Sequence, residues 1–173
     1  EAKAVARDLI ERLEADPTRS EPMRVALGMA HYVRGHVARR QLDSEPARQS
    51  RLAHEAGEHL RRSVEIHLDL DAEFSNASYS GIANTSKGGL LEVDVALGRA
   101  DPLITIEHIT HELEQVIDPK DASLRGDLLE SWGWWSIFGC NIALRHLGPT
   151  EVHRPMAILT NKASEIADAL GNW

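Results

Sequence analysis

The stretch LAHEAGEHLRRSVEIHLDL, residues 52–70, carries the periodicity that decides the fold class. Small and apolar side chains recur at helical spacing on one face, whereas arginine and glutamate side chains occupy the other. This spacing is typical of an amphipathic helix that packs on one side only. We expect this helix to begin at Ser44-Glu45-Pro46, where a proline suits a first helical turn, and to end near Leu70.

The same spacing extends outward in both directions. Pro17 ends a first apolar stripe, Asp118-Pro119 ends a later one, and Gly148-Pro149 breaks the helix after that. The remaining helices are predicted over residues 2–15, 21–41, 102–117 and 122–147, and over a last segment that closes at Gly171.

Residues 75–95 give the weakest pattern. Residues 75–89 are rich in Ser, Asn, Gly and Thr, and residues 90–95 fit either a short strand or a helical stripe. We favour the helix. Six or seven helices joined by short breaks predict an all-α fold, an antiparallel helix-hairpin array, with residues 1–173 forming a single domain.

Composition limits the classes of function. The 173 residues are 42% hydrophobic and 27% charged, as in a globular domain, and no apolar run approaches the roughly 20 residues that cross a bilayer. The net charge of −8 disfavours direct nucleic-acid binding. The arginines between Arg34 and Arg62 alternate with glutamates, which predicts a solvated helix face. A lone cysteine, Cys140, suits a reducing compartment, so we expect a cytoplasmic protein without membrane contact.

Several segments resemble tetratricopeptide repeats. Gly28-x-Ala30-x4-Gly35 recurs as Gly81-x-Ala83-x4-Gly88, and residues 55–66 and 157–172 are similar to the second helix of that repeat. The family stacks helix pairs of about 34 residues, with small residues where helices cross. The resemblance implies a tetratricopeptide-like solenoid, with residues 38–53 inserted between the helices of one pair. An irregular helical bundle is the other architecture that we consider.

A narrower resemblance lies near the C-terminal end. Residues 129–133 (LESWG), followed by a helix that closes on residues 169–171, resemble the repeat domains of certain bacterial transcriptional regulators. In those proteins the repeats sense a peptide or a small molecule, so the resemblance implies a regulatory, ligand-binding module.

The sharpest chemical motif is His111-Glu112, which resembles the His-Glu-x-x-His helix of zincin metallopeptidases. The resemblance implies that His111 is a zinc ligand and that Glu112 is the general base. Gln115 stands where the second histidine belongs. His108, which shares the helix face, and Glu130 are the candidates to complete a zinc site. The alternative is an ordinary solvated face of an amphipathic helix.

The three tryptophans between residues 132 and 135 lie on different faces of their predicted helix. Trp132 and Trp135 share its apolar stripe and are predicted to be core residues. Trp134 lies roughly 100° off that stripe, so we consider it a groove residue.

The sequence therefore predicts a binding module for a peptide, a protein or a small ligand, rather than an enzyme. The candidate binding residues are Trp134, His108 and His111, on the condition that their helices line one groove. No cofactor is expected for that function. The alternative function is a zinc-dependent hydrolase in which Glu112 activates water, with His111, His108 and Glu130 as metal ligands.

Overall fold

The computed structural model describes residues 2–16, 19–42, 48–115 and 126–171. This part of the chain is all-α, as predicted, and holds no strand. Its helices are α1 (Ala2–Glu14), α2 (Glu21–Arg40), α3 (Gln49–Phe74), α4 (Ala77–Ala96), α5 (Pro102–Gln115), α6 (Gly126–His146) and α7 (His153–Gly171).

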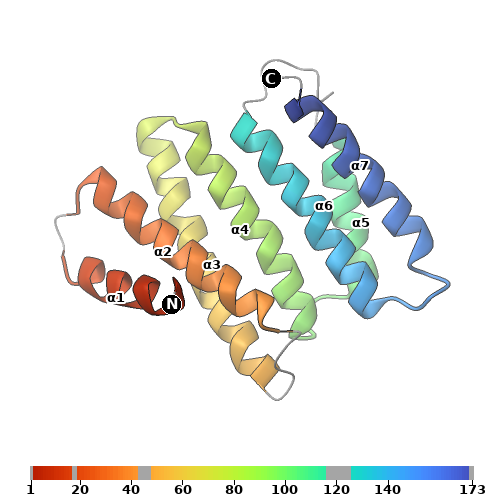
Figure 1. The fold of residues 1–173 in the computed structure, drawn as a ribbon, viewed down its shortest axis with the longest axis horizontal. Coiled ribbons are helices and arrows are strands. Elements are labelled where there is room, and N and C mark those ends of the chain that lie inside the picture. Colours follow the sequence, from red (N-terminus) through yellow and green to blue (C-terminus); the bar gives the residue numbers. More distant parts are fainter. Residues whose placement is uncertain (1, 17–18, 43–47, 116–125, 172–173) are drawn as a thin grey trace.

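Successive helices run in alternating directions, and the even-numbered ones form a layer (Figure 1). Helices α2, α4 and α6 lie side by side and run the same way, with α4 in the middle. Helix α3 lies behind α2 and α4 and packs against both. Helix α1 packs on α2, while α5 and α7 pack on α6 and contact each other. The antiparallel array is confirmed by this arrangement, and a tetratricopeptide-like solenoid stays a prediction.

The apolar stripes predicted from the sequence form the core. Ile109, Leu129, Ile142 and Leu159 are fully buried in a cluster built by α5, α6 and α7. Two further clusters join α1 to α2 and α3, and the end of α2 to α3 and α4. Each fully buried Leu or Ile side chain stabilises the fold by about 1.5–3 kcal/mol. The amphipathic faces therefore account for how the helices associate.

Glycines lie where helices cross, as the repeat pattern predicts. A Cβ on Gly28 would lie 2.6 Å from His67 Cε1, and one on Gly35 would lie 2.7 Å from Leu60 Cγ. A Cβ on Gly88 would lie 2.6 Å from Phe138 Cδ2. These glycines bring α2 close to α3, and α4 close to α6.

Helix α4 resolves the region that the sequence left open. The segment from Ala77 to Ala96 is one continuous helix, so the strand considered for residues 90–95 is wrong and the helix that we favoured is confirmed. Ser75, with φ of 51°, ends α3 in the left-handed region. The side chain of Asn76 then caps α4 by accepting a hydrogen bond from the Ser78 amide at 3.1 Å. Burial between neighbouring helices outweighs the low helix propensity of the α4 glycines.

Several predicted boundaries shift or lie outside the described residues. The helix start at residues 44–46, the stop at residues 118–119 and the start at residue 122 are outside them. Helix α3 continues to Phe74, past the predicted end at Leu70. The insertion predicted over residues 38–53 is wrong where it is described, because residues 38–40 belong to α2 and residues 49–53 to α3. None of the described helices is both long and apolar enough to span a membrane.

Candidate ligand-binding groove

A groove runs over α4, between α2 and α6. Helix α4 contributes Gly81, Thr85, Ser78 and Ile82, whereas the largest side chains, Tyr32 and Trp134, come from α2 and α6. The result is a pair of adjoining hollows of about 330 and 190 Å³ that share Tyr32, Thr85 and Trp134. We call this pair the α2–α4–α6 groove. The groove exists because the small residues Gly81 and Thr85 of α4 lie between Tyr32 of α2 and Trp134 of α6.

Aromatic rings from two helices form the walls of the groove. Trp134 stacks on Phe138 with ring centroids 6.2 Å apart, and both belong to α6. From α2, Tyr32 contacts His36 edge to face at 4.4 Å, and the His36 ring stacks on Phe138 at 6.0 Å. Trp134 is half-buried and lines both hollows, which agrees with its predicted position in a groove.

The other two α6 tryptophans are core residues, as predicted. Trp135 is 6% exposed, and its indole Nε1 donates a hydrogen bond to the Asn84 carbonyl at 2.8 Å. Trp132 is partly buried against the C-terminal core cluster, 4.9 Å from the Trp135 ring. Their helix positions thus separate them from Trp134.

One end of the groove is basic and rests on a buried ion triad. Arg39 on α2 and Arg145 on α6 both pair with Glu92 on α4, whose side chain is 1% exposed. The Arg39 guanidinium carbon also lies 4.8 Å from the centre of the Phe138 ring, within cation–π range. The sequence predicted that the arginines between Arg34 and Arg62 lie on a solvated helix face, and this prediction is wrong for Arg39, which is buried. Two arginines against one glutamate leave the triad with a net positive charge.

His36 joins this basic end as a neutral side chain. The pKa of His36 is lowered from 6.5 to about 3, first by burial and then by the positive charges of Arg39 and Arg40. The Arg39 Nε donates a hydrogen bond to His36 Nδ1 at 3.3 Å, which assigns the imidazole proton to Nε2. Nε2 is covered from solvent and has no hydrogen-bond partner among the described residues. His36 thus lines the groove as a neutral ring whose Nε2 is covered.

The opposite end of the groove is acidic and rich in hydroxyl groups. Glu130 on α6 is exposed there, and Ser78, Ser131 and Thr85 lie around it. The pKa of the Tyr32 hydroxyl is raised, first by burial and then by the negative charge of Glu130. The two ends of the groove therefore carry opposite charges, with a carboxylate at one end and arginines at the other.

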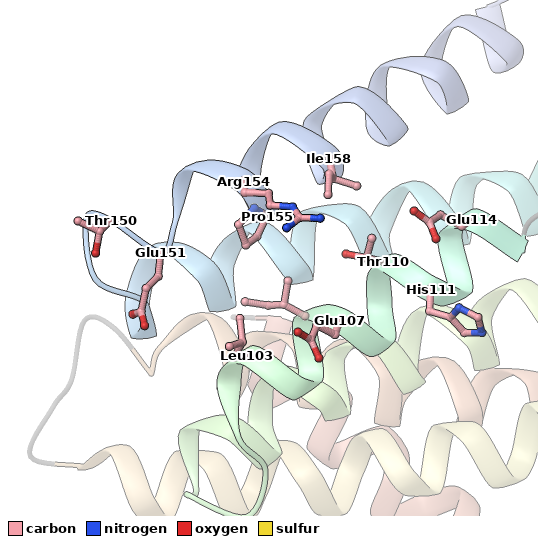
Figure 2. A pocket seen from close by; sticks show the side chains of 11 residues that line it. Leu103, Glu107, Thr110, His111, Glu114, Thr150, Glu151, Arg154, Pro155 and Ile158 are labelled. Atoms are coloured by element: carbon pink, nitrogen blue, oxygen red, sulfur yellow. The ribbon is translucent and has the colours of Figure 1, made fainter.

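A separate hollow of about 510 Å³ lies between α5 and α7. Figure 2 shows Glu107, Thr110 and Glu114 of α5 facing Arg154 and Ile158 of α7. His111 lines this hollow and Trp134 does not. The condition that the two residues line one groove is therefore not met.

The structure also separates the residues considered for zinc. His108 Nδ1 lies 3.9 Å from Glu112 Oε1, whereas Glu130 lines the α2–α4–α6 groove and His111 lines the α5–α7 hollow. Among the described residues, which include all four of these, no three His, Cys, Asp or Glu side chains are grouped so that they could hold a metal ion. This donor set does not fit a zinc ion as it stands, and the hydrolase alternative stays a prediction. Gln115 is exposed at the end of α5.

Sequence analysis missed a buried histidine pair between α2 and α3. His31 Nδ1 lies 2.9 Å from His59 Nδ1, and His31 Nε2 lies 3.5 Å from Glu14 Oε1 on α1. The pKa of His31 is lowered to about 4, first by burial and then by the neighbouring His59. The pKa of His59 is also lowered, chiefly by burial. No local motif signals this pair, since its members come from different helices.

Comparison with known proteins gives no relative for this chain: no protein family, no curated protein and no solved structure matches it significantly. The tetratricopeptide, regulator and zincin resemblances therefore stay predictions from the sequence.

Proposed function

We propose that this chain is a binding module that holds a peptide or small ligand in the α2–α4–α6 groove. The observation that supports the proposal is the pair of half-buried aromatic side chains, Tyr32 and Trp134, which face each other across Gly81 and Thr85 of α4, with Phe138 buried beside them. Aromatic rings with few rotatable bonds offer a large contact area at low entropic cost, which is why they dominate binding sites.

The size and chemistry of the groove support the same proposal. Its two hollows, about 330 and 190 Å³, together lie within the range of pockets that bind small ligands. Tyr32 and Trp134 supply apolar surface to both hollows, and charged groups, including Arg40 and Glu130, are at the ends. Such a distribution provides affinity through the apolar surface and orientation through the charged ends.

We also propose a regulatory role, on the basis of where the groove lies. It is built by three helices that are separated in the chain by α3 and α5. A ligand that contacts all three stabilises their arrangement by about RT ln(1 + [L]/Kd). Ligand binding would thereby stabilise the packing of α2, α4 and α6 against one another.

Trp134→Ala tests the proposal. Pools of random tetrapeptides are equilibrated with the protein across a dialysis membrane, and the retained peptides are quantified by mass spectrometry. We expect the wild type to retain a subset of peptides that Trp134→Ala binds at least 10-fold more weakly, since truncation removes a central aromatic contact. Ile104→Ala is the matched control, because Ile104 is 67% exposed on α5, outside the groove. Equal retention by wild type and Trp134→Ala would contradict the proposal.

A further inference from the structure

We infer that the ligand is a zwitterionic peptide of about four residues, extended along the α2–α4–α6 groove, with its C-terminal carboxylate at the Arg40 end and its amino group at Glu130. The inference rests on the proposed function and names its ligand class and direction.

The basic end fits a carboxylate. Arg40 is exposed and lines this hollow. The Arg39–Glu92–Arg145 triad adds a net positive charge. A carboxylate offers two acceptor oxygens, which suit the paired N–H donors of the Arg40 guanidinium group. It would also remain ionised in this positive surrounding.

The arginines at this end overcome an unfavourable helix field. The end of α2 carries Arg39 and Arg40 in its last turn, and α6 carries Arg145 in its last turn. A helix C-terminus alone repels an anion, since its carbonyl oxygens bear partial negative charge. Arginine side chains gathered on these last turns reverse the sign of the local field, so an anion is accepted there.

The acidic end fits an ammonium group. Glu130 supplies a full negative charge, and the hydroxyl groups of Ser78, Thr85 and Ser131 line the same hollow. An ammonium group has three donors and no acceptor, so a carboxylate and neighbouring hydroxyl oxygens satisfy it. The same end would disfavour a second carboxylate, which sets the direction of the bound peptide.

The length of the groove sets the length of the peptide. Tyr32, at the Glu130 end, and Arg40 are eight positions apart on α2, and at ~1.5 Å per residue this span is ~12 Å. An extended chain covers ~3.3 Å per residue, so about four residues bridge the two ends. The Trp134 ring, which lines both hollows, lies between them and would contact an apolar or aromatic side chain of the peptide.

Four forms of one probe test the inference: the tetrapeptide Ala-Phe-Leu-Ala with free termini, N-acetylated, C-amidated, and with both changes. Affinities are measured by isothermal titration calorimetry on the full chain at pH 7. We expect amidation to weaken binding at least 10-fold in the wild type and less than 3-fold in Arg40→Gln. We expect acetylation to weaken binding in the wild type and to have little effect in Glu130→Gln. Arg154→Gln, which changes the α5–α7 hollow, is the matched control and should keep both effects.

The outcomes separate the inference from the proposed function. Equal affinity for all four forms, with binding still lost in Trp134→Ala, overturns the inference and leaves the proposed function standing. Acetylation that loses its effect in Arg40→Gln instead of Glu130→Gln shows the opposite chain direction and also overturns it. If no form binds, the inference fails, and the tetrapeptide pools then decide whether the groove binds ligands at all.

Discussion

Trp134 and Trp135 are adjacent in the chain and have opposite environments. Trp135 is 6% exposed and hydrogen-bonded to α4, whereas Trp134 lines the groove. The environment of each side chain depends on contacts with residues that are distant in the sequence. Arg39 is held by Glu92, which lies 53 positions away, and this pairing frees the Arg39 Nε to fix the tautomer of His36. The chemistry of the groove thus depends on single contacts between helices.

Glu92→Gln is expected to destabilise the fold by about 3–5 kcal/mol, because it leaves the buried Arg39 guanidinium without its counter-charge. Urea unfolding followed by circular dichroism measures the change. Glu112→Gln is the control: its ion pair with His108 is long, at 3.9 Å, and partly exposed, so we expect a change below about 1 kcal/mol. Similar losses in the two variants would show that the triad does not hold the three helices together.

Gly88→Ala tests the close approach of α4 and α6. The added methyl group would lie 2.6 Å from Phe138 Cδ2 and 2.8 Å from Trp135 Cδ1, so the rings or the helix must shift. We expect a loss of about 1–3 kcal/mol in the free energy of unfolding, despite the better helix propensity of alanine. In Gly133→Ala the nearest contact is 3.6 Å from Ile166 Cγ2, so that control should be neutral or stabilising by up to about 1 kcal/mol. Equal losses in both variants would contradict the prediction.

At the scale of elements, the sequence predicts those helices whose signal is local. Residues 52–70 show a one-sided stripe because α3 has one face in the core, and the same holds for α1, α5 and α7. Helix α4 differs, since it is buried by α3 on one side and approached by α6 on another. Small residues then occupy most of its faces, and no stripe is left to detect. Its helical state depends on neighbours that the sequence alone does not place.

The same distinction applies to the groove. Trp134 could be predicted as a groove residue because its angle from the apolar stripe is a property of one helix. The Arg39–Glu92–Arg145 triad and the His31–His59 pair each join different helices, so their formation depends on how those helices pack. His111-Glu112 is the converse case, in which a local motif predicts a site for which Glu130, the candidate ligand from the next helix, lines a different hollow. Spacing along one helix is predictable, and contacts between helices are not.

At the scale of the whole molecule, buried histidines make stability depend on pH. The pKa is lowered to about 4 in His31 and to about 3 in His36, and it is lowered in His59 and His67 as well, in each case chiefly by burial. Arg34 and Arg62 from α2 and α3 add positive charge near His31, while Glu14 from α1 faces its Nε2. Protonation of both His31 and His59 would also place two protons in a 2.9 Å contact between their Nδ1 atoms.

The sign of the effect follows from linkage. Above the unfolded-state pKa of about 6.5 these histidines are neutral in both states, so the full stability is present. As the pH falls below 6.5, the unfolded chain binds protons that the folded chain does not, and stability is lost until the folded pKa is reached. At pH 5 each strongly shifted histidine costs on the order of 2 kcal/mol, a large part of the 5–15 kcal/mol typical of a domain. We therefore expect the Tm to fall by about 10 °C between pH 7.5 and pH 5.

His31→Gln isolates one contribution to this loss. The variant removes a single titrating group, so its Tm should fall less than that of the wild type over the same pH interval, whatever its stability at pH 7.5. His153→Gln, which changes an exposed histidine at the start of α7, should keep the wild-type slope. Thermal unfolding by circular dichroism at half-unit pH steps gives both slopes. If His31→Gln and the wild type lose Tm in parallel, the buried pair does not govern acid stability, and partly buried carboxylates would have to account for the loss.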